Sequence, residues 1–144
     1  MESTITTKFI IGDNEGITLL SSLAAATIRE KYGNGIPETQ LENFILKRFS
    51  HAALAKEMNN LNSQFLIVYS SEEPAGFAWI TSGGERPAIL KGTTVARIPE
   101  FGILKKFDND AVRKGLMDKV LRVCGMQQIV WIGGHDELLN TTHE

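Results

Sequence analysis

The sequence has little cysteine, no excess of basic residues and no long apolar run, and each shortage excludes a class of protein. Cys124 is the only cysteine among 144 residues, so no internal disulfide can form, and we expect a reducing, cytoplasmic setting. The formal net charge of -2 argues against general nucleic-acid binding. No apolar run approaches the roughly 20 residues needed to span a bilayer, and the N-terminus lacks the pattern of a secretory signal. We therefore expect a protein without a membrane or nucleic-acid partner.

Metal ligands and domain boundaries are also missing. His51, His135 and His143 are scattered without metal-ligand spacing, so we expect no metal site. The chain has no internal repeat, low-complexity tract or evident linker. Its length and its 42% of hydrophobic residues are those of one globular domain, which we place at 1–144.

Strand and helix signals alternate along the chain. Apolar stripes at helical spacing predict helices in the first half over 15–35, 37–49 and 51–60. Runs of β-branched and aromatic residues predict strands at 5–11, 63–70, 75–82, 93–107 and 127–134. The residues at 135–140 are consistent with one further helical turn.

One more helix lies between the last two predicted strands. Asp110 is a suitable N-cap for a helix over 111–125, which Gly125 ends. The strand–helix–strand order predicts a parallel strand pair with a right-handed crossover. In the strand before this helix, Pro99 lacks the N–H that a ladder needs, so we expect a bulge or splay there. The fold class is α+β, with a mixed, mostly antiparallel central sheet flanked by helices.

This order of elements resembles the GNAT superfamily of acyl-CoA-dependent N-acetyltransferases, over about residues 5–135. The residues that carry the resemblance are Phe49-Ser50, Phe65, Pro74 and Gly76-Phe77. The first pair starts a short helix on the substrate side, and the others form the hairpin that follows it. The resemblance implies acetyl-CoA as cofactor and a sheet whose fourth and fifth strands splay apart.

In the family, a glycine-rich loop before the last helix binds the cofactor pyrophosphate through backbone N–H groups. Here most of those glycines are gone, and two registers are possible. One places Asp108, Ala111 and Arg113 at the Gln, Gly and Gly of the motif. The other pairs RKGLMDKVL with the common sequence GKGIGKALL and keeps Lys114 and Gly115. We prefer the second for the helix, although neither restores the motif.

Two interpretations of this loop stay open. In the first, the resemblance implies that the strand backbone and the loop hold the cofactor, at Phe101, Ile103, Leu104, Asn109, Arg113, Lys114 and Gly115. In the second, the helix caps itself and acetyl-CoA binding is lost. Asp108 and Asp110 lie where a pyrophosphate would, and a carboxylate at the N-cap uses the same N–H groups.

Glu100, near the predicted bulge, is the candidate catalytic residue. A glutamate in this strand is often the general base of the family, and the alternative is a surface glutamate beside a proline. Strand parity places Glu100 on the opposite face from Phe101 and Ile103. Tyr32 lies where the family often receives the acceptor, which makes it a candidate substrate residue, although turn residues also belong there.

The resemblance breaks down at the C-terminus. Family members usually continue with a helix that carries a tyrosine general acid and then two more strands. The chain has only Tyr32 and Tyr69, so we expect both this acid and the C-terminal strand pair to be absent. The apolar strand over 127–132 would then have an uncovered edge, which soluble proteins avoid. We therefore expect a homodimer, or a partner that covers the edge of the fifth strand.

Two functions follow from the sequence. The first is an N-acetyltransferase that moves an acyl group from acetyl-CoA to a small amine or peptide amine, with Glu100 as base. The second is a catalytically degenerate GNAT-like protein that binds a ligand or another protein. The substrate-side helices favour the first function, and the eroded loop favours the second.

Overall fold

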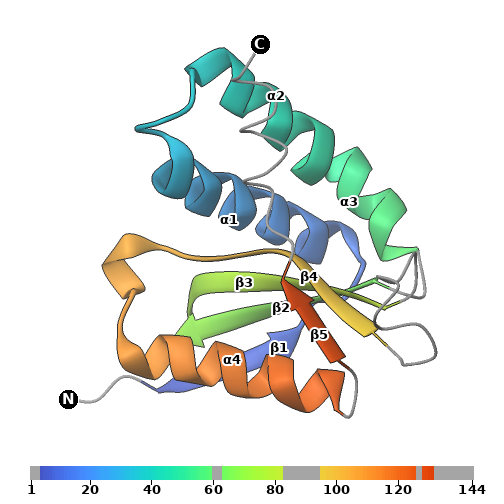
Figure 1. Ribbon diagram of the computed structural model, residues 1–144, viewed down its shortest axis with the longest axis vertical. Coiled ribbons are helices and arrows are strands. Elements are labelled where there is room, and N and C mark those ends of the chain that lie inside the picture. Colours follow the sequence, from blue (N-terminus) through green and yellow to red (C-terminus); the bar gives the residue numbers. More distant parts are fainter. Residues whose placement is uncertain (1–3, 60–62, 83–94, 126–127, 132–144) are drawn as a thin grey trace.

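The computed structural model describes residues 4–59, 63–82, 95–125 and 128–131, and shows a central sheet with helices on both faces (Figure 1). The elements are β1 (Ile5–Phe9), α1 (Asn14–Tyr32), α2 (Glu38–Phe49), α3 (His51–Met58), β2 (Ser63–Ser70), β3 (Glu73–Ser82), β4 (Val95–Ile103), the 3-10 turn η2 (Lys105–Phe107), α4 (Asp110–Cys124) and β5 (Gln128–Trp131). Among the described residues, none of the helices is both long and apolar enough to cross a membrane.

The strands form one five-stranded sheet in the order β1-β2-β3-β4-β5. The first four strands are antiparallel, and β5 pairs with β4 in parallel, from Val95 opposite Gln128 to Ile98 opposite Trp131. The predicted mixed sheet and its C-terminal β-α-β unit are therefore confirmed. The splay expected between the fourth and fifth strands would follow this pairing and lies outside the described residues. The predicted helical turn at 135–140, His135 and His143 also lie outside them.

The sheet separates two hydrophobic clusters (Figure 1). Helices α1, α2 and α3 cover one face, where the largest buried side chains include Leu20, Ile28, Phe49 and Phe77. Helix α4 covers the other face with Val112, Leu116, Val120 and Cys124. Successive side chains of a strand point to opposite faces, so β2 contributes alternately to both clusters and is buried on each side.

Capping residues decide where the helices begin. Ser50 accepts a hydrogen bond from the N–H of Ala53 at 3.2 Å, as predicted for α3. At α4 the prediction was wrong by one residue. The N-cap is Asn109, whose Oδ1 accepts from the N–H of Val112 at 3.0 Å, and Asp110 is the first helical residue. An asparagine and an aspartate are equally good caps, so pattern alone did not separate them.

Strand β4 carries the predicted bulge and lies close to α1. The register with β3 shifts between Trp79 opposite Glu100 and Thr81 opposite Arg97, which brackets Pro99. A Cβ atom added at Gly102 would come within 2.9 Å of the Cβ of Thr27. Glycine therefore lets α1 pack against the backbone of β4.

Candidate functional site

An open cleft lies between α1, β4 and the start of α4. Its volume is about 540 Å³, a size typical of small-molecule and cofactor sites. The described residues that line it are Thr27, Glu30 and Lys31 from α1, Phe101, Gly102 and Ile103 from β4, and Lys105, Asp108, Arg113 and Met117 from the segment that follows. The cleft therefore runs along one strand and ends at the start of a helix.

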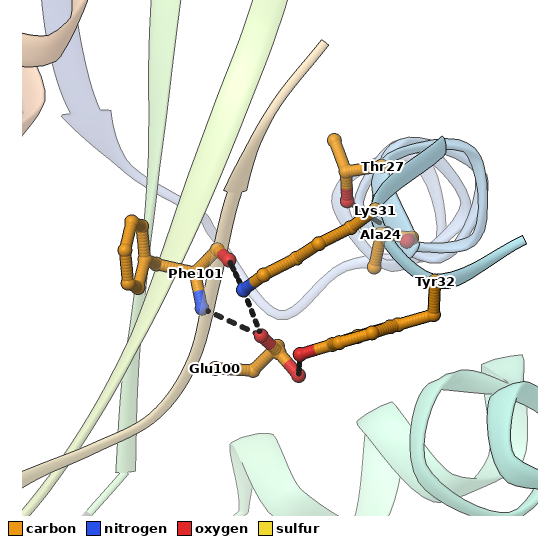
Figure 2. Close-up of polar contacts among 6 residues, drawn as sticks. All are labelled: Ala24, Thr27, Lys31, Tyr32, Glu100 and Phe101. Atoms are coloured by element: carbon orange, nitrogen blue, oxygen red, sulfur yellow. Dashed lines mark hydrogen bonds and ion pairs between the residues drawn. The ribbon is translucent and has the colours of Figure 1, made fainter. Parts of the chain in front are cut away.

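A buried carboxylate stands behind the cleft wall at the α1–β4 contact. Glu100 is only 2% exposed, and its Oε1 accepts from the Nζ of Lys31 at 3.0 Å and from the N–H of Phe101 at 3.3 Å. Figure 2 shows Lys31 and Tyr32 reaching from α1 toward this carboxylate. Lys31 also donates to the carbonyl oxygen of Phe101 at 3.2 Å. Glu100 is therefore an internal group and not a surface residue. We call Glu100, Lys31 and Tyr32 the α1–β4 triad.

Tyr32 completes the triad as a neutral donor. Its hydroxyl donates to Oε2 of Glu100 at 3.5 Å, which is a long hydrogen bond. Burial raises the pKa of Tyr32, and the negative charge of Glu100 raises this pKa further. The phenol therefore keeps its proton at neutral pH and faces the carboxylate as O–H.

The other end of the cleft carries an exposed ion pair. The guanidinium of Arg113 donates to both carboxylate oxygens of Asp108, at 2.6 and 2.9 Å. This bidentate pair lowers the pKa of Asp108 and raises that of Arg113. The side chains of Arg113 and Asp108 remain 59% and 32% exposed, so water reaches the pair and weakens it. We call it the loop pair.

Solved structures with CoA share this architecture. The PaiA N-acetyltransferase from Thermoplasma acidophilum, in complex with coenzyme A, matches with a TM-score of 0.65 at 17% identity, over 83% of this chain and 71% of that one. A predicted acetyltransferase from Clostridium acetobutylicum with acetyl-CoA matches with a TM-score of 0.64 at 13% identity, over 90% and 80%. An aminoglycoside N-acetyltransferase in complex with CoA gives 0.61 at 13% identity, over 99% and 86%. No protein-family model matches the sequence.

This chain has the GNAT fold. The resemblance noted in the sequence is thereby confirmed at the level of architecture. Identities of this size show the fold alone, so the roles of individual residues depend on the geometry of this chain.

Within the GNAT fold, the residues predicted to hold a cofactor fall into two groups. Phe101, Ile103 and Arg113 line the cleft. Phe101 and Ile103 also pack toward the α4 side of the sheet, opposite Glu100, as strand parity indicates. Leu104 packs toward the α1 side instead, and its N–H donates to Ala75.

The remaining predicted loop residues have other contacts. Asn109 caps α4, and Lys114 pairs with Asp118 at 2.9 Å on the exposed surface of the helix. Gly115 lies against β1, where an added Cβ would meet Cγ2 of Ile5 at 2.6 Å and where Thr7 donates to its carbonyl at 3.0 Å. None of these loop residues is among the described residues that line the cleft.

No sequence pattern pointed to the cleft residues from α1. Lys31 is a basic residue in the last turn of a helix, where the helix dipole alone favours a cation. Glu30, whose Oε1 accepts from the N–H of Lys105 at 2.8 Å, likewise looks like a surface residue. The described part of the chain holds no group of three or more His, Cys, Asp or Glu side chains arranged for a metal ion.

Proposed function

We propose that the cleft binds an acyl-CoA and that the protein transfers the acyl group to the amine of a small molecule or peptide. One observation carries the proposal. A cleft of cofactor size runs along β4 to an arginine at a helix start, Arg113, and the cleft residue Lys31 pairs with the buried carboxylate of Glu100. The proposal is also supported by the GNAT fold, because this chain shares that fold with acetyltransferases whose structures contain CoA or acetyl-CoA.

The loop pair would hold the phosphate end of the cofactor. A pyrophosphate that enters between Asp108 and Arg113 exchanges one anionic partner of the guanidinium for another. The N–H of Val112 donates to Asn109, whereas the other first-turn N–H groups of α4 point out of the helix start, where a phosphate could accept from them. Gly102 and Ile103 of β4 line the part of the cleft where the pantetheine arm would lie.

The α1–β4 triad would serve the chemical step. An acceptor amine must lose a proton as it attacks the thioester, and Glu100 is the nearby carboxylate that can take it. The C–N bond forms, the C–S bond breaks, and the CoA sulfur leaves as a thiol after taking up a proton. Because Tyr32 stays neutral, it can keep donating to Glu100 throughout.

Calorimetric titration of acetyl-CoA at low salt tests the binding step. Arg113→Glu and Lys114→Glu make the same charge change at neighbouring positions of α4, but only Arg113 lines the cleft. We expect wild-type binding, a loss of about tenfold or more in Arg113→Glu, and a loss of less than about threefold in Lys114→Glu. Equal losses in both variants, or no heat with the wild type, would contradict the proposal.

A second candidate function has its own observation. The asparagine cap on α4 and the carboxylate on Arg113 already occupy groups that a pyrophosphate would use. This self-satisfied helix start favours a GNAT-like binding module without transfer activity. If neither the wild type nor Asp108→Asn produces heat with acetyl-CoA, this second function replaces the first.

We also propose that a second copy of the chain, or another protein, covers the edge of β5. Within the described residues β5 has a strand neighbour on one side only, and an uncovered edge is a template for pairing. Sedimentation equilibrium of the purified protein is expected to give a dimer mass. A stable monomer in which the amides of β5 exchange freely with solvent would contradict the proposal.

A further inference from the structure

Lys31 has an unusual position for a lysine in a cleft. Its Nζ lies 3.0 Å from Oε1 of the buried Glu100 and 3.2 Å from the carbonyl oxygen of Phe101, while its side chain remains 40% exposed. The residue also lines the cleft. A potential nucleophile is therefore held next to a proton acceptor, as Figure 2 shows for Lys31 and Glu100.

The same contacts distinguish Lys31 from the other lysine of the cleft. Lys105 lines the cleft too, but among the described residues only Lys31 of these two has its Nζ within hydrogen-bond distance of a carboxylate. An amine attacks a thioester only after it loses its proton, so a carboxylate at this distance is the group that an amine nucleophile needs.

We propose that Lys31 is itself an acylation site, modified by the acyl-CoA that binds in the same cleft. The inference rests on the proposed function for its cofactor. It goes beyond that function because the acceptor is a side chain of the protein. Holding the amine and the thioester in one cleft makes the reaction effectively unimolecular, which favours Lys31 over exposed lysines.

The step balances without a further reactant. The Lys31 ammonium gives one proton to Glu100, and the neutral amine attacks the carbonyl carbon of the thioester. The N–C bond forms and the C–S bond breaks. The leaving CoA sulfur takes up the second proton that the nitrogen loses, so the products are an amide on Lys31, free CoA and a protonated Glu100 that returns its proton to solvent.

Acylation would change the site for later reactions. The amide of acyl-Lys31 carries no charge, so its ion pair with Glu100 is lost. The carboxylate keeps its contacts with Tyr32 and with the N–H of Phe101. An incoming amine would then meet a carboxylate that the Lys31 ammonium no longer neutralises. Self-acylation would thus act as a priming step for transfer to an external acceptor.

The test combines peptide mass mapping with calorimetry on the full chain. Wild-type protein is incubated with acetyl-CoA, and acetylation of Lys31 is followed over time against Lys56, an exposed lysine of α3 that reports background chemistry. We expect Lys31 to react at least about tenfold faster than Lys56. Glu100→Gln is expected to slow Lys31 about tenfold while acetyl-CoA affinity stays within about threefold. Lys31→Arg should abolish the fast phase, and Lys56→Arg should leave it intact.

The outcomes separate this inference from the proposed function. If acetyl-CoA binds and Lys31 reacts no faster than Lys56, self-acylation is wrong and the proposed function stands. If acetyl-CoA does not bind, both are wrong. The wild-type comparison of the two lysines needs no variant, so it decides the matter even where Glu100→Gln fails to fold.

Discussion

The two ends of the cleft each hold one carboxylate against one cation, yet they are built differently. The α1–β4 triad joins residues 69 positions apart, and its carboxylate, Glu100, is 2% exposed. The loop pair joins Asp108 to Arg113, five positions apart in an exposed segment. The first contact is part of the packing between a helix and the sheet, whereas the second is local.

Burial determines which of the two pairs a ligand can open. Removing one partner of a buried pair leaves a charge that water cannot reach, which is strongly unfavourable. An exposed pair exchanges its partner for water or for another ion at little expense. The loop pair is therefore suited to release Arg113 to a phosphate, and the triad is suited to hold a carboxylate in place for chemistry.

The largest expected effect breaks the triad. Lys31→Met keeps the apolar stem but removes the ammonium beside the buried Glu100. We expect the free energy of unfolding to fall by roughly 2 kcal/mol at neutral pH, below the value for a fully buried pair because Lys31 is partly exposed. Arg113→Met, its counterpart in the loop pair, is expected to leave stability unchanged. Urea denaturation measures both, and equal losses would remove the distinction between the two ends.

A glycine pair tests how closely a helix packs on each face of the sheet. Gly102→Ala places a Cβ 2.9 Å from the Cβ of Thr27, so α1 must shift, and we expect a loss of about 1–2 kcal/mol in the free energy of unfolding. Gly115→Ala places a Cβ 2.6 Å from Cγ2 of Ile5, so the edge strand β1 must shift, but the change to alanine also gains about 1 kcal/mol of helix propensity. Gly115→Ala should therefore lower the free energy of unfolding by less than half as much as Gly102→Ala does. Thermal unfolding of the two variants makes the comparison, and the reverse order would contradict it.

The carboxylate of Asp108 in the loop pair is expected to oppose cofactor binding. Asp108→Asn removes the carboxylate that occupies Arg113 and that would repel a phosphate. We expect acetyl-CoA to bind about three- to tenfold more tightly. Asp118→Asn is the matched control, because Asp118 pairs with Lys114 on the outer surface of the same helix. Calorimetry that shows weaker binding in Asp108→Asn would mean that Asp108 positions Arg113 for the ligand.

The smallest effect concerns pH. The pKa of Tyr32 is raised in the folded state, so above the ordinary phenol pKa of about 10 the unfolded chain loses a proton that the folded chain keeps. The stability that Tyr32 contributes is present below about pH 10 and declines as the pH rises further. Between about pH 9 and about pH 10.5, the free energy of unfolding should fall less in Tyr32→Phe than in the wild type, by under about 1 kcal/mol. Parallel pH dependences of wild type and variant would exclude a raised pKa.

Local features of the fold could be predicted from the sequence. The bounds of β2 at 63–70 agree with the run SQFLIVYS, and Ser50 caps α3 as expected. The start of β3 was placed two residues late, because Ser71 and Glu72, both with positive φ, make a tighter turn than Pro74 suggested. Each of these features depends on residues a few positions apart, which pattern rules describe well.

The site could be predicted only in part, since its contacts are long-range. Glu100 was singled out by the resemblance, which puts a glutamate in this strand, and by the bulge that Pro99 predicts. Lys31 was missed because its partner lies 69 residues away. Gly115 was read as a phosphate-loop glycine, but its contact with Thr7 spans 108 residues and shows a packing role that no local motif contains. Contacts between helices and strands that are distant in the sequence, and not a local motif, determine the surroundings of these residues.

The central claim is that the cleft along β4 is the acyl-CoA site, and site-resolved NMR tests it most directly. Acetyl-CoA is titrated into isotope-labelled protein while backbone amide signals are followed. Shifts are expected at Gly102, Ile103 and Arg113, and none at the second hollow of the surface, around Thr6 and Tyr69 on β1 and β2. Shifts confined to that second hollow, or no shifts at all, would contradict it.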